Sequence, residues 1–342
     1  MGQYRVPVRI LLVVNAFASS VTARNTVVVH RALSQGNEVE VVETNRRGHA
    51  TRFAQDAARR GVDVVIGYGG DGTLNEVATG VAGTDTALGV LPGGSTNVFA
   101  RTLGMPNDPV TAVHQLAEGI AARTIEPIGL GRVNGRYFCF HTGVGYDAAV
   151  VKEVERRASW KRWLGHPLFI YAALRTWMVD YDRESPHFRV EVGHDGPPPT
   201  AADLLLADGT ASAPGMSEGD GDPVDGYFTV VLNTNPYTYL GNRPLDLSPA
   251  ATLDRGLVAI TFRSMSLGAI LGGLGGALRG GGVRPSSTLD VRTDLRSLRI
   301  TAAHDHGMPY QLDGDYLGET RSLEFVHVPE AVRLVRPQSS AR

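Results

Sequence analysis

The chain has 342 residues, with 33 basic and 35 acidic side chains that give a formal net charge of −2. This length is typical of two domains. The near-neutral charge gives no global attraction to nucleic acid or to an anionic surface. The single cysteine, Cys139, excludes an intramolecular disulfide framework and a cysteine-rich zinc site. We therefore expect a cytoplasmic protein with two hydrophobic cores and without a nucleic-acid partner.

The N-terminal stretch MGQYRVPVRILLVVNAF contains an apolar run that is too short to span a membrane, and it lacks a signal-peptide cleavage pattern. It predicts a buried first strand instead. Similar apolar runs alternate with helical stretches, so we expect strands at 8–14, 39–42, 62–66 and 87–91 and helices at 50–60, 73–81 and 109–121. Continuous apolar strands are typical of a parallel sheet covered on both faces, which predicts a doubly wound α/β domain.

From about Thr124 onward the pattern changes to short strand-like segments separated by turn residues, which is typical of an antiparallel β-sandwich. These segments lie at 137–142, 188–192, 203–206, 227–232, 257–262, 289–292, 298–301 and 323–328. A helical segment, roughly Asp147 to Asp180, interrupts them. The glycine-rich stretch Leu267–Gly282 is too short for a membrane span and predicts a buried or loosely ordered helix.

The segment Asp208–Asp225 is polar and poor in bulky residues, which predicts a mobile surface loop. Its acids Asp220, Asp222 and Asp225 superficially suggest calcium binding. The closing glutamate of a complete calcium loop is missing, so a solvated loop is the favoured interpretation.

The stretch VDVVIGYGGDGTLNEV joins an apolar strand to a helix through a cluster of glycines. Gly67, Gly69 and Gly72 satisfy G-x-G-x-x-G, but they follow the third apparent strand, and the next strand runs into Pro92 where a ribose-binding acid would be expected. Bare backbone at a helix start suits a phosphate group better. Asp71 would repel that phosphate unless it binds metal, accepts a hydroxyl hydrogen bond or pairs with arginine.

Two further observations concern the same region. Thr73 and Glu76 have the spacing of a capping box, in which each side chain would satisfy a backbone amide at the helix start. The stretch LGVLPGGSTNVFAR (Leu88–Arg101) repeats the order of strand, glycine turn, hydroxyl pair and helix. Because ligands of open α/β sheets bind at the carboxyl ends of the strands, we expect both turns to share one crevice.

Lysine occurs only at Lys152 and Lys161, and neither lies in a Walker-type loop or in the strand motif of a protein kinase. A phosphate ligand of this chain would therefore be held by backbone amides, arginine and metal.

With GVGYDA at Gly143–Ala148 and QLDGDYLG at Gln311–Gly318, these motifs resemble those of the bacterial diacylglycerol kinase and sphingosine kinase family of lipid kinases, from about Val8 to Pro337. The resemblance implies an ATP-binding α/β domain similar to that of NAD kinases and phosphofructokinases, a β-sandwich lipid-substrate domain and a cleft between them. It also implies that the last segment returns to the first domain. The expected domains are residues 1–128 with 316–337, residues 129–315, and a tail of residues 338–342.

The resemblance also implies a set of site residues. Nucleotide contacts fall on Asn15, Thr44, Gly69, Gly70, Asp71, Gly72, Thr73, Asn75, Glu76 and Ser95. Contacts with the lipid fall on Gly94, Thr96, Asn97 and Asp313. Asp71 and Asp315 would be the catalytic carboxylates, and Asp71 and Asp254 would be ligands of Mg²⁺.

Three departures from the family pattern stand out. The chain has NAFASS after the first strand, where the family commonly has N-P-x-[SA]-G. In LDRGLVAI, Arg255 occupies the usual acid position of an accessory magnesium site, and Asp254 is the candidate substitute. Asp315 stands where the family has a glutamate as the proposed general base, so its side chain is one methylene shorter.

We therefore predict an ATP- and Mg²⁺-dependent lipid kinase that phosphorylates the primary hydroxyl of a diacylglycerol-like lipid to give a phosphatidate. Phosphoryl transfer requires in-line positioning, neutralisation of phosphate charge and an acceptor for the hydroxyl proton. The glycine-turn amides and Mg²⁺ would serve the phosphates, Asp71 would hold metal or the acceptor hydroxyl, and Asp315 would take the proton. An NAD-kinase-like soluble kinase and a non-catalytic lipid- or nucleotide-binding homologue are the alternatives.

A water-insoluble acceptor must be collected from a bilayer. The segment 156–178 places basic residues beside interfacial aromatics, as surface-lying segments do. The residues concerned are Arg156, Arg157, Trp160, Lys161, Arg162 and Trp163. This predicts peripheral membrane association of a cytoplasmic enzyme, with packing of the tryptophans in an interdomain core as the alternative, and it leaves a homodimer open.

Overall fold

The computed structural model describes residues 6–156, 185–193, 222–305 and 307–338 of the chain. Their contacts divide them into two compact units. Unit 1 holds residues 6–128 and 330–338, and unit 2 holds residues 129–156, 185–193, 222–305 and 307–329. The strands β5 (Ile125–Val133) and β18 (Ser322–Val335) each contribute residues to both units.

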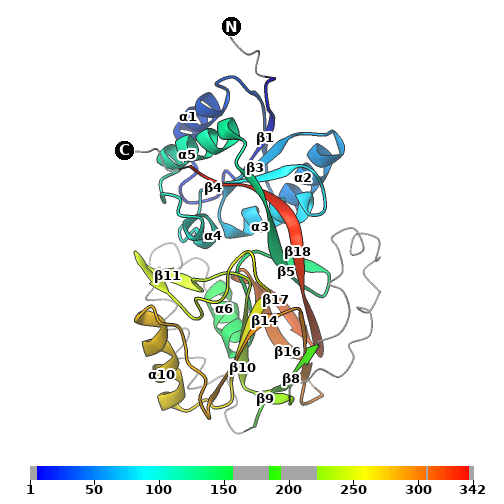
Figure 1. Ribbon diagram of the computed structural model, residues 1–342, viewed down its shortest axis with the longest axis vertical. Coiled ribbons are helices and arrows are strands. Elements are labelled where there is room, and N and C mark those ends of the chain that lie inside the picture. Colours follow the sequence, from blue (N-terminus) through cyan, green and yellow to red (C-terminus); the bar gives the residue numbers. More distant parts are fainter. Residues whose placement is uncertain (1–5, 157–184, 194–221, 306, 339–342) are drawn as a thin grey trace. The chain divides into compact units, whose positions relative to one another are not determined.

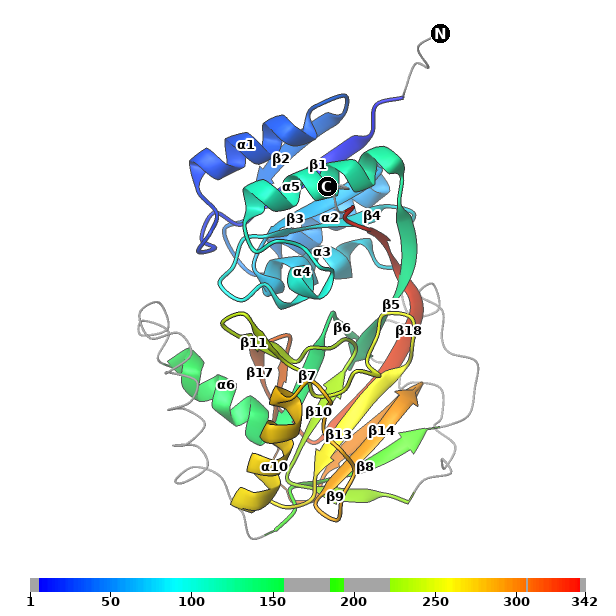
Figure 2. The same cartoon turned by 60° about the vertical axis from the view of Figure 1, so that its left-hand side comes forward.

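Unit 1 is built on a parallel sheet with the strand order β2-β1-β3-β4, to which the last residues of β18 add beside β4. Its strands are β1 (Arg9–Val14), β2 (Glu38–Glu43), β3 (Val64–Gly69) and β4 (Ala87–Pro92). Its helices are α1 (Ala23–Leu33), α2 (His49–Arg59), α3 (Asp71–Val81), α4 (Val98–Thr102) and α5 (Pro109–Ala122). Within this unit, α1 packs beside α5 and α2 beside α3, on opposite faces of the sheet (Figures 1 and 2). The predicted doubly wound α/β arrangement is confirmed.

The burial of the strands explains this order. All residues of β3 and β4 are buried, and β1 is buried after Arg9, because both faces of these strands are covered by helices. The edge strand β2 reads EVEVVE and none of its residues is buried. Its three glutamates are suited to an exposed edge, where unpaired backbone would otherwise favour pairing with another chain.

Unit 2 contains an antiparallel sheet in the order β14-β13-β10-β7-β16-β17. Its strands are β7 (His141–Gly145), β10 (Phe228–Leu232), β13 (Leu257–Phe262), β14 (Leu289–Leu295), β16 (Met308–Leu312) and β17 (Asp315–Thr320). A second set runs from β18 through β15 (Ser297–Ala302) and β8 (Phe188–Gly193) to β9 (Val224–Gly226), and β5 pairs with β18 and with β6 (Arg136–Phe138). One buried cluster draws side chains from strands of both sets, including Val144, Val231, Ile300 and Phe325, which confirms the predicted sandwich.

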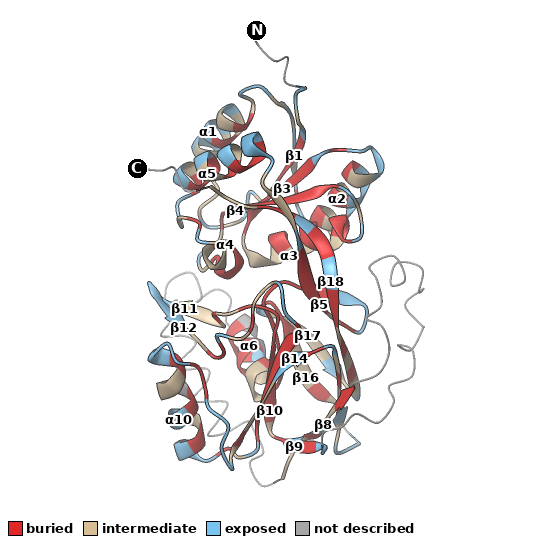
Figure 3. Ribbon diagram, viewed as in Figure 1, coloured by how far each residue is buried: buried red, intermediate tan, exposed pale blue. Residues whose placement is uncertain are grey.

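The outer face of the six-stranded sheet carries a second core of unit 2. Val230, Ile260 and Phe262 of this sheet pack with Ala277 of α10 (Leu267–Leu278) and with residues next to the small hairpin β11 (Thr238–Leu240) and β12 (Arg243–Leu245). Figure 3 shows a buried and an exposed side of α10. The glycine-rich stretch is thus a helix that starts at a capping serine, Ser266, and is buried on one side only, which corrects the expectation of a buried or loosely ordered helix.

The boundary between the units differs from the expectation at the C-terminal end. Residues 316–329 were expected in the first domain, but they belong to unit 2. The reason is strand pairing, because β17 pairs with β16 and the first residues of β18 pair with β15, for example Val326 with Ser297. After unit 2, the chain returns to unit 1 at Glu330.

Several predicted segments lie outside the described residues. These are the strand 203–206, most of the loop 208–225, and the helical and membrane-binding segment after residue 156, of which α6 (Tyr146–Arg156) is the described beginning. Asp225 is described, and it lies on β9 with its carboxylate 2.9 Å from Arg189 Nε, so this acid belongs to a strand and not to a calcium loop. Among the described helices, none is long and apolar enough to cross a membrane.

Candidate active site

The two glycine turns of unit 1 lie against each other at the carboxyl ends of β3 and β4. Gly69 pairs with Pro92 in the parallel register, and Gly93 N donates to Gly69 O at 2.7 Å. A Cβ added to Gly93 would lie 2.8 Å from Gly69 Cα, and one added to Gly94 would lie 2.8 Å from Gly70 Cα. The two turns can approach this closely only without side chains, so the expectation that they share one edge of the sheet is confirmed.

The residues after β1 and β2 reach the same edge. Asn15, which follows β1, donates from its backbone N to Tyr68 O at 2.9 Å and from Nδ2 to Thr73 Oγ1 at 3.0 Å. Thr44, which follows β2, donates from its backbone N to Val14 O at 2.8 Å. The chain continues from β1 to β2 on one side and then to β3 on the other side, so the strand order reverses at β1. Ligands of open α/β sheets bind at such a point of reversal.

The predicted capping box is wrong. α3 begins at Asp71 with Gly70 as its N-cap, so Thr73 lies inside the first turn, and no side chain caps the helix. Thr73 is buried and accepts a hydrogen bond from Asn15 instead. The Glu76 carboxylate accepts from Gly48 N at 2.8 Å and from other backbone at the start of α2, which makes it the anion at the start of a neighbouring helix.

Asp71 has partners that the sequence did not suggest. Its two carboxylate oxygens accept hydrogen bonds from Val98 N and Phe99 N, each at 3.0 Å. Asp71 therefore holds the start of α4, and these amides compensate part of its negative charge beside the glycine turns. Its side chain is half-buried, so it lies at the surface of the site. Its roles as a metal ligand and as a catalytic group stay predictions.

The second turn is held by Asn97. This residue is 1 % exposed, adopts a left-handed conformation with φ of 50°, and bonds Gly94 twice, accepting from Gly94 N at 2.7 Å and donating to Gly94 O at 2.8 Å. Its Nδ2 also donates to Asn107 Oδ1 at 2.6 Å. Asn97 thus shapes the turn, and the more exposed Ser95 and Thr96 carry the hydroxyls that a ligand can reach.

In unit 2, the LDGD motif forms the tight turn between β16 and β17. Leu312 pairs with Asp315, and Asp313 and Gly314 between them have φ of 47° and 84°, the left-handed values that two-residue hairpin turns require. The two acids differ in environment. Asp313 is 6 % exposed, whereas Asp315 at the start of β17 is half-buried.

Asp313 is a structural anchor of this turn. Its Oδ2 accepts from Cys139 N at 2.7 Å, and its Oδ1 accepts from Phe140 N at 3.0 Å and from His141 N at 3.1 Å. Three charge-assisted bonds to buried backbone fix the turn to the start of β7. Gly314 N donates to Gln311 Oε1 at 2.8 Å, which adds a second link. The predicted contact of Asp313 with lipid stays a prediction.

Asp147 is a candidate that the sequence reasoning did not include. It lies in the first turn of α6, and its carboxylate accepts hydrogen bonds from Gln311 Nε2 at 2.8 Å and from the Tyr237 hydroxyl. Burial raises the pKa of the Asp147 carboxyl, an effect that these two hydrogen bonds oppose, and burial beside Asp147 raises the pKa of Tyr237 well above its usual value. Through Gln311, Asp147 is connected to the turn that carries Asp315.

Gly143 makes room for this acid. A Cβ at Gly143 would overlap the Asp147 carboxylate and lie 2.8 Å from Gln311 Nε2. The available signal in the sequence was the GVGYDA motif, whose glycine and acid are four residues apart, but only the path of β7 into α6 shows that they meet. The His141 ring lies tilted against the Tyr237 ring, with their centroids 4.3 Å apart. Burial lowers the pKa of His141 to about 3, so this imidazole is neutral.

A preformed metal cage does not fit the described residues. No group of three or more His, Cys, Asp or Glu side chains within this part of the chain could hold a metal ion. Asp254 is exposed beside Arg255, and its role as a substitute ligand of an accessory Mg²⁺ stays a prediction. Mg²⁺ that enters with ATP requires no such cage, because it is commonly held by one or two carboxylates, phosphate oxygens and water.

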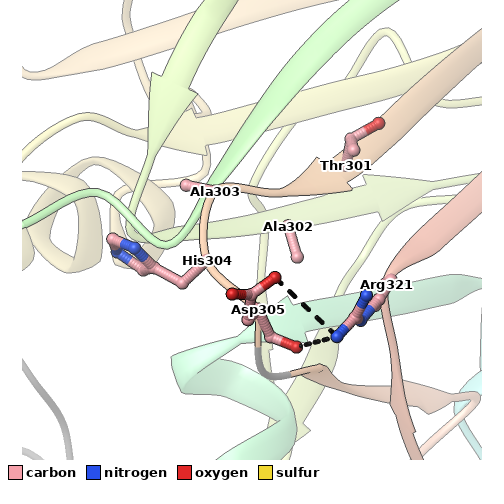
Figure 4. Close-up of a pocket in the computed structure, with 6 residues that line it drawn as sticks. All are labelled: Thr301, Ala302, Ala303, His304, Asp305 and Arg321. Atoms are coloured by element: carbon pink, nitrogen blue, oxygen red, sulfur yellow. Dashed lines mark hydrogen bonds and ion pairs between the residues drawn. The ribbon is translucent and has the colours of Figure 1, made fainter.

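A cavity of about 470 Å³ lies elsewhere in unit 2, between the end of β15 and the start of β18 (Figure 4). It is lined by Thr301, Ala302, Ala303, His304, Asp305 and Arg321. Arg321 Nη2 donates to Asp305 O at 2.5 Å across it. None of the predicted site residues lines this cavity, so it is not part of the candidate site.

Comparisons with known proteins match part of the chain to a known domain family. Residues 9–133 match the model of the diacylglycerol kinase catalytic domain. The chain contains a diacylglycerol kinase catalytic domain. This match covers the parallel strands, both glycine turns and the Asn15 segment of unit 1, and it confirms the family that the motifs predicted.

Relatives extend the similarity beyond this domain. The chain is 43% identical over 113 residues to "Diacylglycerol kinase" of Bacillus subtilis (strain 168), a match that spans 32% of this chain and 36% of that protein. It is 29% identical over 313 residues to "Probable lipid kinase YegS-like" of Pseudomonas aeruginosa strain PAO1, across 89% of this chain and 87% of that one. The kinase domain and these kinase-named relatives support the expectation of a lipid kinase.

The crystal structure of a diacylglycerol kinase from Bacillus anthracis str. Sterne has the same fold. It superimposes with a TM-score of 0.64 and 18% identity and covers 96% of both chains. The folds of both units of this chain therefore occur together in one solved protein.

Proposed function

We propose that this chain transfers the γ-phosphoryl group of ATP to the free hydroxyl of a diacylglycerol-like lipid and releases a phosphatidate. The observation that carries the proposal is the pair of side-chain-free turns packed at the carboxyl edge of the diacylglycerol kinase domain, Gly69–Gly70 against Gly93–Gly94. Bare backbone amides at such an edge suit a polyphosphate, and the kinase family implies ATP as the phosphoryl donor.

In unit 1, the site residues divide into those that shape the turns and those that reach a ligand. The side chains of Asn15 and Thr73 bond each other, and Asn97 holds the backbone of Gly94. Gly70, Gly72, Asn75, Ser95 and Thr96 are partly or fully exposed. We assign the phosphates of ATP to this exposed set and to the turn amides, with Mg²⁺ entering as part of the MgATP substrate.

In unit 2, Asp315 is the proposed acceptor of the hydroxyl proton. It is half-buried at the first residue of β17, on a turn that Asp313 and Gln311 hold by buried hydrogen bonds. A base must stay within hydrogen-bond reach of the hydroxyl during transfer, so a rigid support favours this role. Asp147, which the same Gln311 holds, is the second carboxylate of this cluster and keeps the turn in position.

Partners and location follow from the acceptor. A diacylglycerol-like lipid is insoluble in water, so a protein that uses it would work at a membrane surface while remaining peripheral. The segment 156–178 was predicted to provide this contact and lies outside the described residues. A cytoplasmic location and a homodimer belong to the same proposal.

An acceptor panel tests the proposal. Purified protein with γ-labelled ATP and Mg²⁺ is offered dispersed diacylglycerol, a sphingoid base or NAD, and the labelled products are separated. Labelled phosphatidate from diacylglycerol, with no labelled product from NAD, is the expected result. Labelled NADP would establish the soluble dinucleotide kinase, and nucleotide binding without any labelled product across the lipids would establish a non-catalytic homologue.

A further inference from the structure

The outer side of α10 presents an apolar surface that nothing in the described part of the chain covers. The helix reads LGAILGGLGGAL and contains no polar or charged side chain. Leu271 is 62% exposed and Leu278 is 46% exposed. They are seven residues apart, so they occupy the same side of the helix at a separation of about 10 Å along its axis.

The opposite side of α10 fixes the helix to unit 2. Ala277 is fully buried and Ala269 is 7% exposed. A Cβ added to Gly273 would lie 3.2 Å from the Phe262 ring, and one added to Gly276 would lie 2.8 Å from Gly282 O. Glycine in a helix is intrinsically unfavourable, but here it allows α10 to pack closely against unit 2. The helix therefore has a fixed orientation, with the exposed leucines on its outer side.

Positive charge borders this surface. Arg263 precedes α10, and Arg279 and Arg284 follow it, and all three are exposed. From Arg263 to Thr288 the sequence contains no acidic residue. Within the residues that the structure describes, these guanidinium groups form no ion pair with a carboxylate at or below 4.0 Å, so they are available to an external anion.

We propose that α10 is a membrane-docking surface, with Leu271 and Leu278 entering the interface of a bilayer and the three arginines binding anionic headgroups. Exposed leucines complement the apolar chains of such an interface, and exposed arginines complement the negative charge at its surface. A second copy of this chain would place the same arginines against one another, which opposes self-association through this face. The inference rests on the proposed lipid acceptor.

Vesicle cosedimentation of the full chain, without ATP and with vesicles that contain no diacylglycerol, tests the docking surface separately from catalysis. The probe is phosphatidylcholine mixed with phosphatidylglycerol. The double variant Leu271→Asn/Leu278→Asn should lose about tenfold or more in vesicle affinity, since it removes the inserted apolar area. Arg279→Glu/Arg284→Glu should lose about fivefold per arginine and most of the salt dependence.

Matched controls separate this surface from general stickiness. Val27→Asn removes a side chain on α1 that is 67% exposed, and Arg136→Glu reverses an exposed arginine on β6. Both should bind vesicles like the parent protein. A single variant, Leu271→Trp, should show a larger blue shift of tryptophan emission on vesicles than the parent, which contains Trp160, Trp163 and Trp177. The difference between the two proteins reports entry of position 271 into the interface.

Activity on two forms of the acceptor distinguishes the two proposals. With a short-chain diacylglycerol dissolved as monomers, Leu271→Asn/Leu278→Asn should match the parent, while its rate on vesicles should fall. If this variant bound vesicles as strongly as the parent, α10 would not be the docking surface. If the variant also changed from dimer to monomer, the exposed side of α10 would be a contact between two copies of the chain instead. Absence of turnover by the parent on both forms would instead refute the lipid kinase and leave the vesicle result to stand alone.

Discussion

Replacing Asp313 by asparagine separates structural from catalytic roles in the LDGD turn. Asparagine keeps one carbonyl oxygen, which can still accept from Phe140 N and His141 N as Oδ1 of Asp313 does. Its amide group then faces Cys139 N, which at present donates to Oδ2 at 2.7 Å. The side-chain amide and Cys139 N are both hydrogen-bond donors, and they would face each other at a residue that is only 6% exposed.

The expected cost follows from these three bonds. Losing one charge-assisted bond costs about 1.5–3 kcal/mol, and the other two weaken because charged acceptors are roughly twice as strong as neutral ones. The total should be about 3 kcal/mol of the free energy of unfolding, a large part of the 5–15 kcal/mol that is typical of a folded protein. The variant should still fold, and its turnover per folded molecule should fall less than that of Asp315→Asn.

Urea unfolding followed by intrinsic fluorescence measures this change. The midpoint should fall while the slope with urea stays constant, since the same surface is exposed on unfolding. Asp305→Asn is the matched control in the same unit, because its side chain is fully exposed, and it should leave the midpoint unchanged. A midpoint for Asp313→Asn equal to that of the parent would show that the three bonds do not hold the turn.

Two other predictions concern the cluster around Asp147. Gly143→Ala should destabilise the protein by about 3 kcal/mol in urea unfolding, because the added methyl group overpacks the site and breaks hydrogen bonds to Asp147. The control Gly272→Ala lies in open space on α10 and should stabilise the protein by about 0.5–1 kcal/mol. Equal changes in the two variants would contradict the steric explanation. His141 has a folded pKa of about 3 and an ordinary value of 6.5, so the unfolded chain binds the additional proton between these values. The free energy of unfolding should therefore fall as the pH drops below about 6.5, and His141 should contribute up to about 1.4 kcal/mol per pH unit to this fall. In a series of unfolding curves at different pH values, His141→Phe should show a smaller dependence on pH. A dependence equal to the parent's would contradict a buried neutral imidazole.

The parts of the fold that were predictable are those with local causes. The buried strands of unit 1 are continuous apolar runs, and the turns after β3 and β4 need glycine for close approach, so both are visible in the residues themselves. The order of the turns along the chain was enough to place them at one edge of the sheet. The motifs then identified the family that the comparisons confirm.

The errors arose where distant segments compete for the same group. Thr73 and Glu76 have capping-box spacing, but Asn15 and the start of α2 bind their side chains instead. The amides of α4 bind Asp71, a contact that its neighbours in the sequence did not predict. Asp147 was missed because its position depends on β7, β16 and the loop after β10 together. The sides of α10 could not be assigned, because a helix without polar residues has no amphipathic pattern.

The most direct test of the account is the rate of phosphatidate formation by Asp315→Asn at saturating MgATP and dispersed diacylglycerol. Asp315 is half-buried on a turn that other residues hold, so this variant should keep the parent's unfolding midpoint and its affinity for ATP. We expect a loss of about 10²–10⁴-fold in turnover, the usual contribution of a general base, and partial activity for Asp315→Glu. Phosphatidate formation by Asp315→Asn at the parental rate would contradict it and would move the proton to another acceptor, with Asp71 as the next candidate.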